Sequence, residues 1–117
     1  MSKATRGEVW EVNFFPGVGA EIQKSRPAVV MGAEGVGRLP LALVVPVTDW
    51  KPVFEQYSWF VHLQPLAGSG LSKESGADAF QIKSVSESRL VRRLGMLAES
   101  AIGEIAAAVA LCVGHEP

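Results

Sequence analysis

The sequence predicts a mainly β protein of the α+β class, a small barrel-like antiparallel sheet with a C-terminal helix. Two observations predict this fold. Short apolar stretches of strand length alternate with loops rich in glycine and proline along most of the chain. The last stretch then changes to the apolar spacing of a helix. With 117 residues, the chain suits a single domain spanning 1-117, with its core at about 5-114.

The first predicted strand is Glu8–Phe15, where Trp10, Val12 and Phe14 alternate onto one face. Leu41–Val47 is almost wholly apolar, which is typical of a central strand buried on both faces, although Pro46 indicates a bulge or an edge. The remaining strands are expected at Pro27–Met31, Ser58–Leu63, Ala77–Lys83 and Val91–Leu97.

A helix is predicted over Glu99–Val113. Apolar residues recur there at helical spacing, and alanine, the best helix former, dominates its second half. Ala98 cannot cap the helix with its side chain, so Glu99 or Ser100 is expected to do so. A single helical turn is expected over Ser86–Leu90.

Composition argues against several classes of protein. The chain has neither an apolar run of membrane-spanning length nor the apolar block of a signal peptide, and its lone Cys112 cannot form an internal disulfide, so a cytoplasmic protein is expected. It has no Cys/His array and no carboxylate cluster, so no metal and no cofactor are expected. His62 and His115 are the only imidazoles, and neither is expected to be catalytic. The net charge of −1 does not indicate nucleic-acid binding, but a local basic groove is compatible with it.

Five sequence blocks, in this order, carry a resemblance that spans nearly the whole chain. They are Arg6-Gly7-Glu8-Val9-Trp10, Gly19-Ala20-Glu21, Arg26-Pro27-Ala28-Val29-Val30, Val45-Pro46-Val47-Thr48 and Gln81-Ile82-Lys83-Ser84. With them the chain resembles the MazF/PemK toxins. The resemblance implies a homodimeric SH3-like barrel that cleaves single-stranded RNA at a short sequence and is inhibited by a cognate antitoxin.

The resemblance also implies that Arg26 and Thr48 are catalytic. The 2′-OH of RNA supplies the nucleophile, so the enzyme must stabilise a dianionic phosphorane. A planar guanidinium suits two phosphoryl oxygens, and a threonine hydroxyl can donate one more hydrogen bond. Arginine is a poor base because it stays protonated, so Glu21 is the candidate for the base or for RNA contact. Its alternative is a loop carboxylate paired with Lys24 or Arg26.

The substrate groove is expected between the Pro16–Gln23 and Asp49–Gln56 loops. Gln81 is expected to read a base edge there, or else to bond to backbone. Lys83 is expected to bind phosphate. The other RNA-binding candidates are Lys24, Gly19, Asp49 and Lys51. The aromatic residues Trp50, Phe54 and Tyr57 are expected either to stack bases or to cover a dimer edge.

This chain has Phe80 where the family commonly has an acidic residue, which either changes the base preference or adds a stacking surface. Two alternative functions remain for a chain of this kind. One is a gyrase-poisoning toxin of the same fold, and the other is a catalytically inactive member. The Arg26-Pro27 and Val47-Thr48 pairs favour the ribonuclease, because a poison would need neither.

Overall fold

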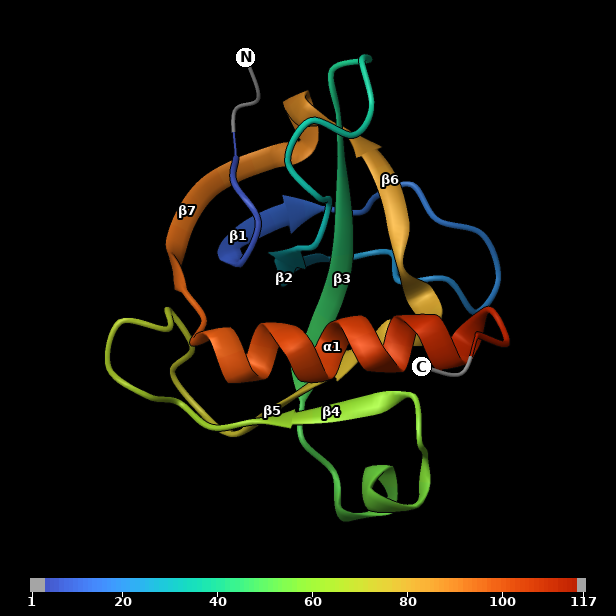
Figure 1. Cartoon of the computed structure of the whole chain (residues 1–117), viewed down its shortest axis with the longest axis vertical. Helices are drawn as coiled ribbons and strands as arrows, with labels where there is room; N and C mark the ends of the chain where they lie inside the picture. Colours follow the sequence, from blue (N-terminus) through green and yellow to red (C-terminus); the bar gives the residue numbers. More distant parts are fainter. Residues whose placement is uncertain (1–3, 116–117) are drawn as a thin grey trace.

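The computed structural model describes residues 4–115 and contains one seven-stranded antiparallel sheet and a C-terminal helix (Figure 1). The strands are β1 (Glu8–Asn13), β2 (Ser25–Val30), β3 (Leu41–Asp49), β4 (Phe60–Leu63), β5 (Ser75–Asp78), β6 (Lys83–Ser86) and β7 (Leu90–Met96). The helix α1 is Glu99–Cys112, and the short 3₁₀ helices are η1 (Pro52–Gln56), η2 (Ala79–Gln81) and η3 (Glu87–Arg89).

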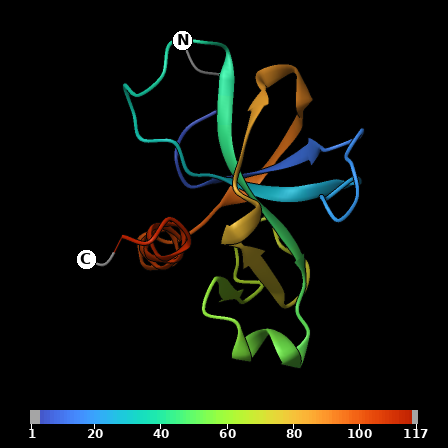
Figure 2. The ribbon, with the colours of Figure 1, turned by 90° about the vertical axis from the view of Figure 1, so that its right-hand side faces the viewer.

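The strand order is β4-β5-β3-β2-β1-β7, with β6 paired to β3, and the ends of the sheet are not joined. The predicted antiparallel sheet with a C-terminal helix is therefore confirmed, in its open form and not as a closed barrel. The strands twist strongly across one another when the molecule is viewed along α1 (Figure 2). This helix crosses the sheet over β3 and lies beside β4 (Figure 1).

β3 is the central strand, as predicted, and it changes partner along its length. Residues 41–44 pair with β6 and residues 47–49 pair with β5, while β2 pairs on the other side. Pro46 lies between the segment that pairs with β6 and the segment that pairs with β5. On that side of β3 it has no partner strand, so its missing N–H costs no hydrogen bond. The prediction of burial on both faces holds for Val44–Val47 but not for Leu41 and Leu43, which are exposed.

The sheet separates two apolar cores. One lies between the sheet and α1, and there Val45, Val47 and Ile105 are buried. The other lies under the opposite face of β1, β2 and β3, with Trp10, Val12, Ala28 and Val44 among its residues. Alternation along β3 therefore sends odd-numbered residues towards the helix and even-numbered residues to the second core.

The Ala77–Lys83 strand prediction was wrong, because this segment is divided among β5, η2 and β6. The side chain of Asp78 accepts a hydrogen bond from the backbone N–H of Phe80 at 3.2 Å, and this local bond replaces a ladder bond. The expected helix cap is also absent. Within residues 4–115, neither Glu99 nor Ser100 caps α1 with its side chain, and Ala98 is the N-cap residue.

The loop at residues 64–74 is held on β7 by direct backbone contact. Glycines allow this approach, since a Cβ on Gly95 would meet the carbonyl carbon of Ser69 at 2.4 Å, and one on Gly70 would meet that of Leu94 at 2.5 Å. The backbone N–H of Met96 donates to the carbonyl of Gly68 at 2.9 Å. This glycine seam fixes the loop beside the ends of β2 and β3.

Candidate active site

Arg26 and Thr48 line one hollow of about 400 Å³, called here the arginine hollow. β2 and β3 pair with Ala28 opposite Pro46, and this register, continued by two residues, sets Arg26 opposite Thr48. Arg26 precedes a proline, which holds it in the extended conformation of the strand. The hollow is completed by Pro27, Val47, Asp49, Gly70, Leu71, Ser72, Lys73, Ser75, Arg92 and Leu94.

The charged groups of the arginine hollow are paired, with one exception. Lys73 Nζ lies 3.1 Å from Asp49 Oδ2, and Arg92 Nε donates to Glu11 Oε1 at 3.0 Å. The hydrogen bond from Arg92 lowers the pKa of Glu11 and keeps this carboxylate charged. Arg26 is a half-buried residue. Among residues 4–115, its guanidinium has no hydrogen bond or ion pair to another side chain or to the backbone, so its donors are free for a ligand.

A second hollow of about 450 Å³ opens between the loop at residues 14–24 and η2, and is called here the glutamine hollow. Three sequence-predicted residues line it, namely Glu21, Gln81 and Lys83. Its apolar wall includes Phe80, which is 71% exposed, so its ring is accessible from solvent. The remaining lining residues are Phe14, Ala20, Ile22, Pro46 and Ile82.

Both ends of the Gln81 amide are already bonded to the protein. The backbone N–H of Ile22 donates to Gln81 Oε1 at 2.9 Å, and Gln81 Nε2 donates to Asp78 Oδ2 at 3.1 Å. Burial raises the pKa of Asp78 in spite of the hydrogen bonds from Gln81 and Phe80. Gln81 therefore ties the loop at residues 14–24 to η2, and each end of its amide keeps one hydrogen-bonding position for a ligand.

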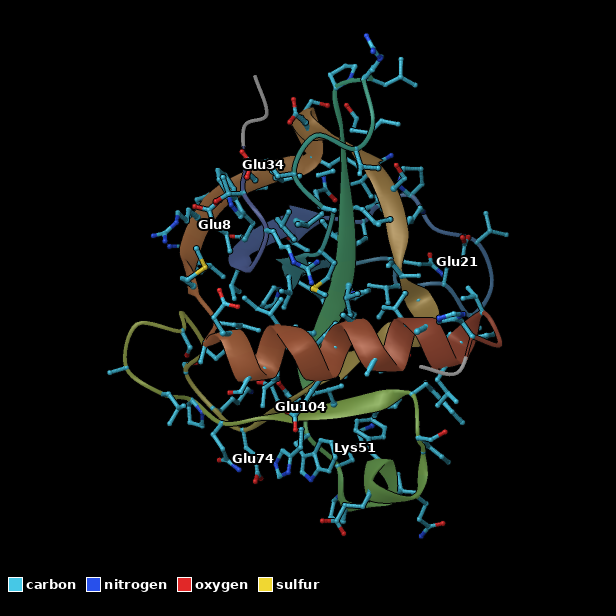
Figure 3. The ribbon with its side chains drawn as sticks, viewed as in Figure 1. Glu8, Glu21, Glu34, Lys51, Glu74 and Glu104 are labelled. Carbon is cyan, nitrogen blue, oxygen red and sulfur yellow. The ribbon has the colours of Figure 1, made fainter. Side chains whose placement is uncertain are left out.

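Glu21 pairs with neither of its predicted partners, Lys24 and Arg26. Its Oε1 accepts a hydrogen bond from the backbone N–H of Val18 at 2.7 Å, and its Oε2 lies 4.0 Å from Lys83 Nζ. Figure 3 shows Glu21 on the loop that joins β1 to β2, while Lys51 and Glu74 lie away from it, near β4. Glu21 thus lines the glutamine hollow and not the arginine hollow.

The structure divides the nine predicted site residues into three groups. Arg26, Thr48 and Asp49 line the arginine hollow, and Glu21, Gln81 and Lys83 line the glutamine hollow. The third group lines neither hollow and consists of Gly19, Lys24 and Lys51.

Lys73 and Arg92 line the arginine hollow but were not among the predicted site residues. Lys73 is the only basic residue in the loop at residues 64–74, a signal that could have found it. The sequence around Arg92 gives no indication of its position. Arg92 lies beside Glu11 only because β7 pairs with β1, a strand far away in the sequence. Among residues 4–115 there is no cluster of three or more metal-ligating side chains and no helix long and apolar enough to cross a membrane.

These features define a small antiparallel β protein whose free guanidinium and neighbouring hydroxyl share a hollow suited to an anionic ester. The chain belongs to the family of PemK-like, MazF-like toxins of type II toxin–antitoxin systems, since the family model matches residues 5–113. The resemblance found in the sequence is confirmed.

Individual relatives agree with this assignment. The chain is 31% identical over 112 residues to the endoribonuclease MazF9 of Mycobacterium tuberculosis, covering 91% of this chain and 92% of MazF9. Its fold matches MazF from Deinococcus radiodurans with a TM-score of 0.77 at 23% identity, covering 95% and 96% of the two chains. It also matches a mycobacterial endoribonuclease in complex with its cognate antitoxin, with a TM-score of 0.76 at 16% identity, covering 97% and 98%.

Proposed function

We propose that this chain is the toxin of a type II toxin–antitoxin system and acts as a metal-independent endoribonuclease on single-stranded RNA with a short recognition sequence. The observation that carries the proposal is that Arg26 and Thr48, from adjacent strands, line the same hollow. The similarity to the endoribonuclease MazF9 supports the choice of substrate.

Catalysis begins with attack of the 2′-oxygen of RNA on the adjacent phosphorus. The 2′-OH gives its proton to water, the new bond from the 2′-oxygen to phosphorus forms as the bond to the 5′-oxygen breaks, and this oxygen takes a proton from water and leaves as a hydroxyl group. Arg26 stabilises two oxygens of the phosphorane with its planar fork, and Thr48 donates a further hydrogen bond. Because the substrate supplies the nucleophile, positioning and electrostatics are the main tasks left to the protein.

Glu21 lines the glutamine hollow, which favours contact with a neighbouring nucleotide over proton transfer beside Arg26. Gln81 and Lys83 line the same hollow, where an amide suits a base edge and an ammonium suits a phosphate. Outside the two hollows, the RNA backbone is proposed to contact Lys24, Gly19 and Lys51. Asp49 holds Lys73 at the rim of the arginine hollow.

The partners proposed are a second copy of the chain, giving a homodimer, and a cognate antitoxin, all in the bacterial cytoplasm. The antitoxin is expected to place acidic and apolar side chains over both hollows, where phosphates and bases would otherwise bind. The fold match to an endoribonuclease solved with its cognate antitoxin motivates this expectation.

The product ends test the chemistry. Purified protein incubated with a long RNA in EDTA is expected to leave 2′,3′-cyclic phosphate and 5′-hydroxyl ends, and to leave DNA intact. A single 2′-deoxy substitution at the cut is expected to abolish that cut alone, because it removes the nucleophile. Loss of cleavage on chelation would contradict the mechanism. Absence of cleavage from a folded protein would favour the inactive member, and trapping of gyrase on DNA would favour the poison.

A further inference from the structure

An aromatic surface follows directly after the catalytic strand and is called here the ring ladder. Its members are Trp50, Phe54, Tyr57, Trp59, Phe60 and His62. Three pairs are stacked, with centroids 3.9 Å apart for Trp50 and His62, 4.0 Å for Phe54 and Phe60, and 4.8 Å for Tyr57 and Trp59. The ladder spans the end of β3, η1 and the start of β4.

Strand register connects the ring ladder to Thr48. Thr48 pairs with Gly76 of β5, and Gly76 pairs with His62 of β4, so the three residues form one row on one face of the sheet. Val47, Ala77 and Val61 form the adjacent row, which faces α1. The Thr48 row therefore lies on the face away from the helix.

Gly76 is the position that lets the rings approach this row. A Cβ on Gly76 would meet ring carbons of Phe60 and Trp50 at 3.1 Å and one of Phe54 at 3.5 Å. Because Gly76 has no side chain of its own, rings of the ladder occupy the space between Thr48 and His62, and the ladder continues from the arginine hollow.

The ladder is not a closed core. None of its rings belongs to a buried residue, and η1 contributes no buried residue at all. His62 is the exposed member, with 34% of its side chain accessible, and it lies over Trp50. Its Nε2 is 2.7 Å from Glu74 Oε2, which fixes the orientation of the ring. His62 thus presents an oriented, accessible ring at the solvent side of the ladder.

Charge along the same edge is mixed, with lysines and carboxylates side by side. Lys73, next to Glu74, pairs with Asp49 at the rim of the arginine hollow, and the exposed Lys51 precedes η1. Among residues 4–115, Lys51 has no ion pair, so its ammonium is available to a phosphate.

We propose that the ring ladder, through His62 backed by Trp50, stacks an unpaired base of the RNA whose scissile phosphate lies between Arg26 and Thr48. The inference rests on the proposed function and adds a site for one nucleotide beyond the cut. Every base has a face that can stack on an aromatic ring, so the site contributes affinity without reading sequence. RNA is the occupant, and not a second copy of the chain, because the ladder is continuous with the phosphate-binding hollow and the exposed ammonium of Lys51 lies beside it.

The experiment measures RNA affinity without cleavage. The probe is a fluorescent single-stranded RNA containing one cut sequence, with 2′-deoxy sugar at the cut, and binding is followed by anisotropy. His62→Leu keeps the volume but removes the aromatic face, and His62→Phe restores a ring. His115→Leu is the matched control, because it changes an exposed histidine at the far end of α1. Thermal melts confirm that all variants fold.

His62→Leu is expected to weaken binding roughly five- to hundredfold, the range for loss of one stacked base, with most of the affinity restored in His62→Phe. His115→Leu is expected to bind like wild type. A series of RNAs, each with an abasic nucleotide at a different position, is then compared. We expect one position beyond the cut where loss of the base weakens binding to wild type but not to His62→Leu. At that position, the abasic RNA binds wild type and His62→Leu equally.

Three results would overturn the inference. His62→Leu binding as tightly as wild type would do so, as would an equal loss for every abasic RNA. A shift of His62→Leu from dimer to monomer in light scattering would assign the ladder to an interface between copies. If the wild-type protein cleaves RNA and His62→Leu binds RNA as tightly as wild type, only this inference is wrong. If the wild-type protein neither binds nor cleaves RNA, the proposed function is wrong as well.

Discussion

In the glutamine hollow the polar side chains are hydrogen-bonded or paired within the protein, whereas in the arginine hollow the guanidinium of Arg26 is not. Gln81 is held between Ile22 and Asp78, and Glu21 between Val18 and Lys83. Arg26 has no such partner among residues 4–115. An amide bonded on both sides suits recognition of a shape, while a guanidinium whose donors are not used by the protein can give all of them to a charge that develops during a reaction. We therefore expect the chemistry in the arginine hollow and the selection of sequence in the glutamine hollow.

Substitution of Arg26 is expected to have the largest effect. Arg26→Ala is expected to lower the cleavage rate by at least ~10²-fold, the usual scale for losing one preorganised donor to a transition state. Arg26→Lys is expected to recover little, since a point charge cannot copy the planar fork. The measurement is single-turnover cleavage of one long RNA, with Arg38→Ala as the control at an exposed arginine. A folded Arg26→Ala protein that cuts at the wild-type rate would end the assignment of the active site.

Thr48 is expected to have a smaller effect. Thr48→Val keeps the shape of the side chain and removes its hydroxyl, so cleavage is expected to fall about 10- to 100-fold, the value of one hydrogen bond to a charged group. Thr48→Ser retains the hydroxyl and is expected to keep part of the activity. The same cleavage assay decides this, and equal activity of the valine and serine variants would show that the hydroxyl takes no part.

Gln81 tests the role expected for the glutamine hollow in selecting the RNA sequence. Gln81→Ala is expected to relax or shift the cut sequence while the rate at the best site changes less than in Arg26→Ala. It also leaves the N–H of Ile22 without its acceptor, at a cost in stability of ~1 kcal/mol. Cuts are mapped nucleotide by nucleotide, with Gln64→Ala, an exposed glutamine, as the control. An unchanged cut pattern would remove the specificity role and leave Gln81 as a loop anchor.

The smallest effect concerns the pH dependence of stability near Asp78. Its pKa is raised by burial, so the folded state binds more protons than the unfolded state as pH rises above the ordinary value of 3.8. The free energy of unfolding contributed by this group therefore falls with rising pH, up to its raised pKa. Asp78→Asn cannot titrate, so chemical unfolding between acid and neutral pH is expected to lose this slope. An identical slope in both proteins would contradict the assignment.

Local patterns predicted much of the fold. Alternation located β1, an almost wholly apolar run located most of β3, and helical spacing located α1 to within one residue at its end. The segment Ala77–Lys83 failed because Asp78 bonds to the N–H of Phe80, and side-chain capping of this kind competes with a strand without changing the apolar pattern.

The candidate site was less predictable, because strand pairing assembles it from distant segments. Arg26 and Thr48 were found through the resemblance, and the register of β2 on β3 is what brings them together. Nothing within the segment of Arg92 indicates that it faces the same hollow. Nor could spacing along the chain show that Glu21 lies in a different hollow from Arg26.

The glycine seam between the loop at residues 64–74 and β7 bears on how a protein of this kind diversifies. Because backbone meets backbone at Gly70 and Gly95, peptide geometry and not side-chain packing sets how closely this loop approaches β7. Exposed positions on the same loop, such as Ser72 and Lys73, can therefore exchange charge and size without moving the wall that carries them. We therefore expect substitutions at these positions to change the surface of the arginine hollow while the seam keeps the loop backbone in place.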